Sequence, residues 1–140
     1  NLLLVWGYWY NIRKFVDSTP ETTLYFPDGR LKPQYLAQLK AIATDAEALG
    51  MVIELALFSQ ESYYSDIRLG KDEADRAVAT LTRELLPHRN VVFQVWNELS
   101  ERVLDHVKTI RANDPKRLVT NSPGVSSILG DRAQNEALDF

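Results

Sequence analysis

The residues best suited to chemistry are three consecutive side chains, Trp96, Asn97 and Glu98. They end an apolar run, Val91–Trp96, that predicts a buried strand. An indole ring stacks on the apolar face of a sugar, an amide binds hydroxyl groups, and a carboxylic acid gives a proton to a glycosidic oxygen. Because a carboxyl group at the mouth of an apolar core is partly desolvated, it holds its proton as a general acid must. Glu98 is therefore the candidate catalytic residue, with Asn97 and Trp96 as candidate substrate contacts.

A second interpretation of Glu98 is structural. A helix is predicted over Leu99–Ala112, and acidic residues are common where helices begin, because a carboxylate meets the positive end of the helix dipole. The strand end alone favours this structural role. The catalytic hypothesis therefore depends on the residues around it.

Other candidate sugar contacts follow the ends of the remaining predicted strands. Aromatic and amide side chains at these positions suit stacking and hydroxyl binding, and they are Trp9, Tyr10, Gln60 and Asn121. Trp6 precedes the point where the first strand should emerge, so we expect it in the core. The pair Tyr63 and Tyr64, in a polar loop, is the candidate for an aromatic platform at the rim.

The other carboxylates receive structural interpretations. Glu54 lies in the middle of a predicted strand, and we expect it to face the interior and pair with Gln94 or an arginine. Glu61 and Asp66 lie in a loop, where they are solvated or bind the edge of a substrate. Asp114–Arg117 is a predicted turn whose charges form a solvated edge.

Metal and nucleotide cofactors are not expected. Cysteine is absent, and neither His88 nor His106 has a partner at ligand spacing. The strand ends carry no glycine-rich phosphate loop. The prediction is a protein with no metal and no cofactor.

Short apolar runs alternate with longer helical patterns, which indicates βα units and a parallel sheet. The predicted strands are Leu2–Tyr10, Met51–Phe58, Val91–Trp96, Arg117–Asn121 and Leu138–Phe140, and the helices are Pro33–Leu49, Lys71–Leu86, Leu99–Ala112 and a short turn at Arg132–Ala137. Two architectures fit this order, an open doubly wound sheet and part of a (β/α)8 barrel. In both, function collects at the carboxyl ends of the strands.

The length and charge of the chain limit the classes of partner that it is expected to bind. The 140 residues predict one domain, residues 1–140, with a net charge of −3 and no basic run, which argues against nucleic acid. The apolar runs are too short to span a bilayer, so no membrane partner is expected. The chain begins with Asn1 and has no visible export signal, and both ends look cut. Secreted and cytoplasmic locations both stay open.

Three segments carry a resemblance to a known group of enzymes. Val92–Leu99 resembles the fourth strand of the cellulase-like clan of retaining glycoside hydrolases, which ends in an Asn-Glu pair. Ala46–Leu55 is similar to the passage into that clan's third strand, and Ile110–Thr120 to the passage into its fifth. With these segments matched in this way, essentially the whole chain corresponds to strands two to about six of a (β/α)8 TIM barrel.

The resemblance implies a function. In the clan the Glu of this pair is the general acid/base, which corresponds to Glu98, and the Asn contacts the sugar's 2-hydroxyl, which corresponds to Asn97. The implied substrate is an oligo- or polysaccharide with β-linkages, cleaved with retention. The clan's nucleophile is a Glu that ends strand seven, and no residue of this chain matches it.

Two alternatives remain. One is a catalytically incomplete half-barrel that binds carbohydrate, and the other is an unrelated α/β module whose Asn-Glu pair is coincidental. A half-barrel exposes two unpaired sheet edges. We therefore expect a homo-oligomer if the 140 residues are the whole protein.

Overall fold

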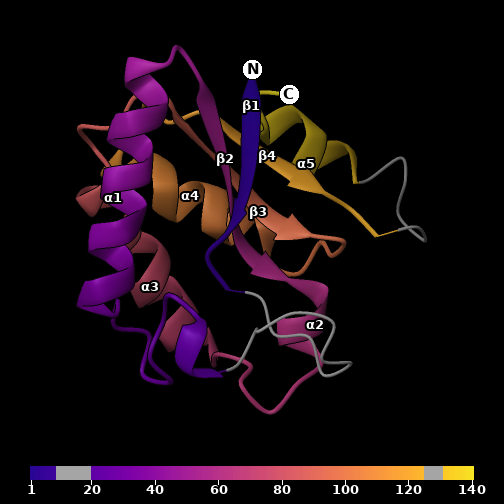
Figure 1. The fold of residues 1–140 in the computed structure, drawn as a ribbon. Coiled ribbons are helices and arrows are strands. Elements are labelled where there is room, and N and C mark those ends of the chain that lie inside the picture. The colour runs from indigo at the N-terminus through magenta and orange to yellow at the C-terminus, as the bar shows by residue number, and fades with distance from the viewer. Residues whose placement is uncertain (9–19, 125–130) are drawn as a thin grey trace.

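The computed structural model describes residues 1–8, 20–124 and 131–140, and it contains one parallel sheet with helices between its strands (Figure 1). The strands are β1 (Leu2–Trp6), β2 (Val52–Ser59), β3 (Val91–Asn97) and β4 (Val119–Ser122). The helices are α1 (Pro33–Ala48), α2 (Gln60–Tyr63), α3 (Lys71–Glu84), α4 (Val103–Asn113) and α5 (Arg132–Ala137), with a 3-10 turn at Pro20–Thr22. The predicted alternation of strands and helices is confirmed.

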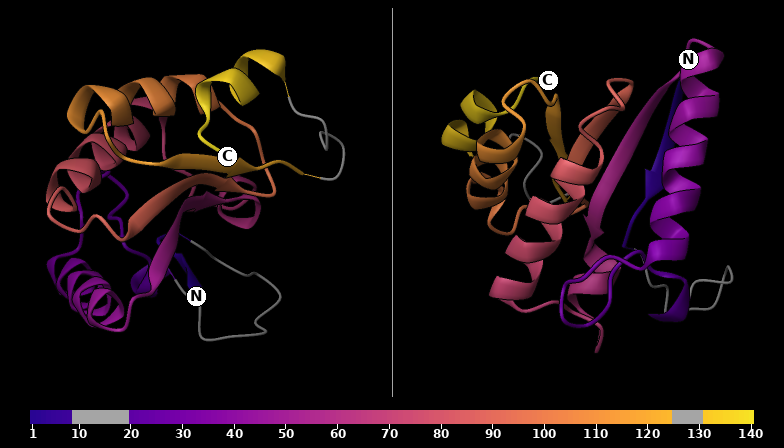
Figure 2. Two further views of the ribbon diagram at one scale, coloured as in Figure 1. Left: turned by 90° about the horizontal axis from the view of Figure 1, so that it is seen from above. Right: turned by 90° about the vertical axis from the view of Figure 1, so that its left-hand side faces the viewer.

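The strand order decides between the two predicted architectures. The four strands are parallel and neighbour one another in chain order, β1-β2-β3-β4. In a doubly wound sheet the order in which strands are added reverses at a switch point, whereas in a (β/α)8 barrel each new strand is added on the same side of the one before it. Figure 2 shows the helices gathered on one side of a curved sheet. The chain is therefore an α/β unit with the topology of a partial barrel.

Local sequence accounts for the helix-covered core. Pro33 begins α1, where its missing N–H costs nothing, and α1 buries Leu39, Ala43 and Ala46 along one stripe. In β2, Ile53, Leu55 and Leu57 lie two residues apart and are fully buried. This period of two places one face of the strand under the helices.

Two local features differ from the sequence prediction. The loop after β2 contains α2, which begins because the Ser59 side chain accepts a hydrogen bond from the backbone N–H of Ser62. Leu138–Phe140 is not a strand in the structure. Its residues nevertheless lie beside β4, since the Asp139 N–H donates to the Val119 carbonyl and Thr120 Oγ1 donates to the Phe140 carbonyl.

The prediction that Trp6 lies in the core is wrong. Trp6 is 44% exposed, Leu2 55% and Leu3 41%. These side chains are exposed because β1 pairs only with β2 among the described strands. An edge strand with one neighbour leaves part of its apolar surface uncovered. The expected homo-oligomer stays a prediction.

The prediction of a solvated edge at Asp114–Arg117 is also wrong for its two end residues. Asp114 and Arg117 are each 1% exposed and form an ion pair of 3.0 Å. The Arg117 guanidinium donates to the carbonyls of Leu85, His88 and Val91. Arg117 thus satisfies acceptors at the end of α3 and the start of β3, which a turn pattern does not reveal.

Candidate functional site at the end of β3

Glu98 follows the last residue of β3 and adopts an unusual backbone conformation. Its φ is 62°, in the left-handed region that residues other than Gly, Asn and Asp rarely enter. Such a conformation costs on the order of 1–3 kcal/mol and persists only where the surroundings enforce it. The side chain is exposed, so the described residues do not supply the desolvation that the sequence analysis expected.

Asn121 holds the loop that carries Glu98. Between the pairs Gln94–Thr120 and Asn97–Ser122, β3 has one residue more than β4, which makes a β-bulge. The Asn121 side chain fills this irregularity.

The bonds of the Asn121 amide show how it does so. Its Oδ1 accepts from the Trp96 N–H at 2.9 Å, and its Nδ2 donates to the Leu99 carbonyl at 3.0 Å and to Ser100 Oγ at 3.2 Å. The amide predicted to bind substrate is therefore engaged within the protein, on both sides of Glu98.

Gly124 packs directly against the backbone of Glu98. A Cβ atom on residue 124 would lie 2.8 Å from the Glu98 carbonyl oxygen, closer than real Cβ contacts come. The same position is 4.0 Å from Nε2 of Gln60. The loops after β2, β3 and β4 therefore meet here, and Gln60 lies beside the backbone that carries Glu98.

Asn97 ends β3 and is half-buried, with Ser59 and Ser122 as its neighbours in the sheet. Within the described ranges its side chain has no hydrogen-bond partner in the structure. Asn97, Glu98 and Gln60 thus bring two amides and a carboxylate to the carboxyl edge of the sheet, which suits binding of hydroxyl groups and proton transfer.

The Trp96 ring lies in the core. It is 6% exposed, and its Nε1 donates to the Glu101 carbonyl at 2.6 Å. Its ring packs against Phe58, Tyr63 and His106, with centroid distances of 4.9, 5.6 and 6.4 Å. Trp96 therefore supports the strand end from within, in contrast to the substrate wall that the sequence analysis expected.

The remaining sequence candidates have mixed outcomes. Trp9 and Tyr10 lie outside the described residues. Tyr64 is 73% exposed, and its ring meets that of the half-buried Tyr63 edge-on at 5.1 Å. Their role as an aromatic platform stays a prediction.

Two carboxylates differ from their expected surroundings. Glu54 is half-buried, and burial raises its pKa, while the Gln94 amide donates to the Trp96 carbonyl. Glu61, expected to be solvated or to bind the edge of a substrate, is half-buried in α2. Its Oε2 has no hydrogen-bond partner in the part of the chain that the structure describes.

Neither a metal cluster nor a membrane helix is found in the described residues. No group of three His, Asp or Glu side chains there is placed to hold a metal ion. Among the same residues, the helices lack the length and apolar character needed to cross a bilayer.

Sequence analysis missed Gly124 and the positioning role of Asn121. The signal for Gly124 was a glycine two residues after a strand end, which is too common to single out a close approach of two loops. The role of Asn121 depends on a bulge in the neighbouring strand, which only the pairing of β3 with β4 reveals.

Comparison with solved structures finds a similar fold. The chain is similar to the crystal structure of PbGH5A, a glycoside hydrolase family 5 enzyme from Prevotella bryantii B14. The TM-score is 0.62 at 12% sequence identity, and the match covers 100% of this chain and 46% of that chain. The likeness is one of fold. The chain thus has a glycoside-hydrolase-like fold and spans just under half the length of that enzyme.

Comparisons at the level of sequence add nothing to this result. No protein-family model matches the chain, and no curated protein matches it either.

Proposed function

We propose that this chain belongs to the catalytic domain of a retaining glycoside hydrolase that cleaves β-linked glycans, with Glu98 as general acid/base. The observation that carries the proposal is the strained backbone of Glu98, φ 62°, held by Asn121 and Gly124 at the carboxyl end of a parallel strand. Strain of this kind concentrates at functional sites, because only a rigid surrounding maintains it.

Two further observations support the same function. The fold is similar to that of a family 5 glycoside hydrolase over the whole chain. In barrels of this type, catalytic residues come from the carboxyl ends of the strands, where Asn97 and Glu98 lie.

The residues have separate roles in the proposed reaction. The Glu98 carboxyl protonates the leaving glycosidic oxygen and later removes a proton from the attacking water. The Asn97 amide binds a sugar hydroxyl, and Gln60 lies close enough to the same loop to bind another part of the substrate. A retaining mechanism also needs a carboxylate about 5–5.5 Å from the acid, and the proposal assigns it to no residue of this chain.

The test is Glu98→Gln in the complete product of the gene that encodes the chain. We expect hydrolysis of β-linked oligosaccharides to fall by about 10²–10⁴-fold, the usual contribution of a general acid. Aryl glycosides with an acidic phenol leaving group need no protonation, so their first step should be nearly unaffected. Azide should restore turnover of these substrates in Glu98→Ala by taking the place of the activated water.

Glu47→Gln is the matched control, because Glu47 is an exposed carboxylate on α1. It should keep full activity. Equal activity of Glu98→Gln and Glu47→Gln on oligosaccharides would remove Glu98 from the mechanism and, with it, the proposed function.

A further inference from the structure

Among the described residues, Tyr64 has the most exposed aromatic ring, with 73% of its surface open to solvent. It follows α2, the short helix that begins where β2 ends. Single exposed aromatic side chains are common on protein surfaces, so this exposure by itself assigns no role. The position of α2 beside the candidate site and the contacts that hold the Tyr64 ring are the observations that do.

Two observations place α2 beside the loop that carries Glu98. At the start of the helix, Nε2 of Gln60 lies 4.0 Å from the point that a Cβ atom on residue 124 would occupy, and this point is 2.8 Å from the Glu98 carbonyl oxygen. At the end of the helix, the Tyr63 ring packs edge-on against Trp96 of β3, with centroids 5.6 Å apart. The helix therefore runs along the same part of the carboxyl edge of the sheet as Glu98.

Tyr64 lies one helical turn beyond Gln60. Its backbone N–H donates to the Gln60 carbonyl at 3.1 Å, which is the hydrogen bond between residues four apart in a helix. One turn advances the chain by about 5.4 Å, and this is comparable with the length of one pyranose ring. If one sugar is bound beside Glu98 and Gln60, Tyr64 is therefore placed to meet the next sugar of the same chain.

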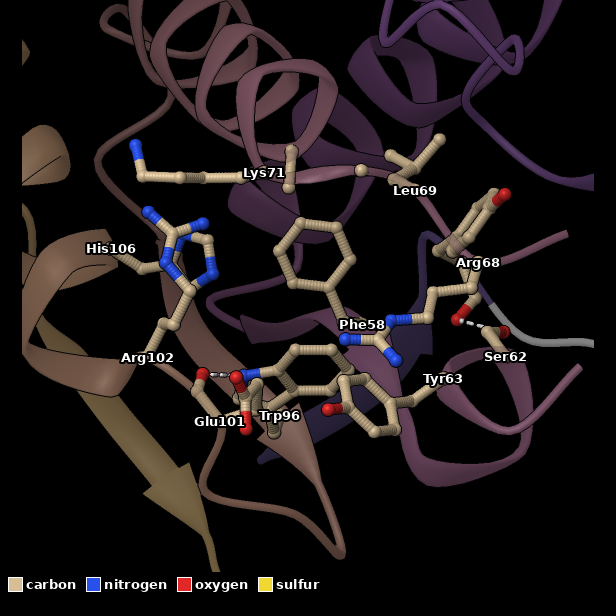
Figure 3. Close-up of a pocket in the computed structure, with 13 residues that line it drawn as sticks. Phe58, Ser62, Tyr63, Arg68, Leu69, Lys71, Trp96, Glu101, Arg102 and His106 are labelled. Carbon is tan, nitrogen blue, oxygen red and sulfur yellow. Dashed lines mark hydrogen bonds between the residues drawn. The ribbon is translucent and has the colours of Figure 1, made fainter.

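Tyr63 supports the Tyr64 ring and is itself covered. The guanidinium carbon of Arg68 lies over the Tyr63 ring, 3.8 Å from its centroid, and the Trp96 and Tyr64 rings meet it edge-on. Figure 3 shows the Arg68 guanidinium and the Trp96 ring against Tyr63. Trp96 is 6% exposed and its indole N–H donates to the Glu101 carbonyl, so these rings are anchored in the core. A ring held in this way loses little freedom when a ligand binds.

We propose that Tyr64 alone is the aromatic platform of an outer subsite, and that the substrate is an extended chain of β-linked, glucose-like sugars. A β-linked glucopyranose carries its substituents in equatorial positions, so each face of its ring presents C–H groups that pack on an aromatic face. The sugar that follows the one at Glu98 stacks on the open face of Tyr64. This inference rests on the proposed function, because it takes Glu98 to mark the point of cleavage.

The test measures binding by calorimetry to the complete product of the gene that encodes the chain. The probe is a hexamer of β-1,4-linked glucose with sulfur in place of the glycosidic oxygens, which resists hydrolysis. We expect the unaltered protein to bind it and Tyr64→Ala to bind it about tenfold more weakly. No binding by the unaltered protein, or equal affinity of Tyr64→Ala, would overturn the proposal.

Three further variants show whether the contact is a stacked ring. Tyr64→Trp keeps an aromatic face and should bind the hexamer at least as tightly as the unaltered protein, whereas Tyr64→Leu is apolar without such a face and should resemble Tyr64→Ala. Leu49→Ala is the matched control, because Leu49 is also 73% exposed but lies between α1 and β2, at the opposite edge of the sheet. It should change nothing. Full binding by Tyr64→Leu, or an equal loss in Leu49→Ala, would contradict stacking on Tyr64.

Failure of this proposal and failure of the proposed function are distinguishable in hydrolysis of the oxygen-linked hexamer. Tyr64→Ala should raise KM about tenfold with little change in kcat, because a stacked outer sugar is bound alike in the ground state and the transition state. Glu98→Gln should lower kcat. If Glu98→Gln stays fully active while Tyr64→Ala weakens binding, the role of Glu98 is wrong and the sugar contact of Tyr64 stands. If Glu98→Gln is inactive and Tyr64→Ala behaves like the unaltered protein, only the platform is wrong.

Discussion

Two regions of the molecule differ in how fully the chain buries their polar groups. One is the packing beneath α3 and α4, and the other is the pair of loops that follow β3 and β4. Beneath the helices, Arg117 is 1% exposed and donates to three backbone carbonyls. Beyond β3, Glu98 is exposed, although its backbone is held in a strained conformation.

The difference follows from the architecture. A βα unit folds its helix back onto the strand beside it, so consecutive units close the helix-covered layer by themselves. The strand ends of a barrel are enclosed only by loops from around the ring. In this chain the helix-covered layer buries Arg117 fully, while the loop with Glu98 stays exposed although Asn121 and Gly124 hold it.

The largest expected effect concerns the buried ion pair. Burial works to raise the pKa of Asp114, but hydrogen bonds from Arg89 and the charge of Arg117 outweigh it and hold the pKa below its ordinary value. Arg117→Met removes the buried partner and should lower the free energy of unfolding by about 3–5 kcal/mol, measured by urea denaturation.

Arg89→Met is the matched control, because Arg89 binds the same carboxylate with a side chain that is 50% exposed. It should cost about 1 kcal/mol or less. Equal losses for the two variants would mean that the helix-covered layer is not the closed region described above.

A smaller effect concerns pH. Burial, and next the charge of Arg102, lower the pKa of His106 to about 4, although Asp75 and Asp105 act in the opposite direction and Lys71 adds to the lowering. In the unfolded chain His106 therefore takes up a proton near pH 6.5, whereas in the folded chain it stays neutral until the pH approaches 4. Stability should fall as the pH drops from about 6.5 toward 4, by about 2 kcal/mol between pH 7 and pH 5.

Two variants assign this loss. His106→Phe has no titrating group in the core and should lose little stability between pH 7 and pH 5 in urea denaturation. His88→Gln should keep the full loss. A loss that survives in His106→Phe would show that another group is responsible.

A third effect, of similar size, concerns the open region. Gly124→Ala places a Cβ atom 2.8 Å from the Glu98 carbonyl oxygen, which forces one of two backbones to move. We expect a cost of about 1–3 kcal/mol in unfolding free energy, together with NMR shift changes at Asn97 and Glu98.

Gly70→Ala provides the comparison, because its Cβ meets the flexible end of the Glu73 side chain. That carboxylate moves aside at little cost. If Gly124→Ala leaves the shifts of Asn97 and Glu98 unchanged, the close contact with Gly124 does not fix the loop.

The sequence alone predicted the elements well where the pattern is local. Pro33 and the apolar stripe of α1 located that helix, and the β-prone run from Val91 located β3, because helix period and strand period are written in consecutive residues. Asn97 and Glu98 were likewise placed correctly at the end of their strand.

The errors concern residues whose surroundings come from distant segments. Trp6 was expected to be buried and Arg117 to be solvated, and both expectations are wrong. Exposure depends on which neighbours a strand has and on which carbonyls need a donor. Asn121 was predicted to bind substrate, whereas its amide bonds to Trp96 and Leu99, which come from another strand end.

The sequence by itself determined the order of strands and helices and the chemical groups at the strand ends, since both depend on residues within a few positions of one another. Only the tertiary structure decided that the sheet follows barrel order, that the Glu98 backbone is held under strain, and that Arg117 is buried against three backbone carbonyls. These properties arise when segments far apart in the chain meet, and a local pattern carries no record of which segments do so.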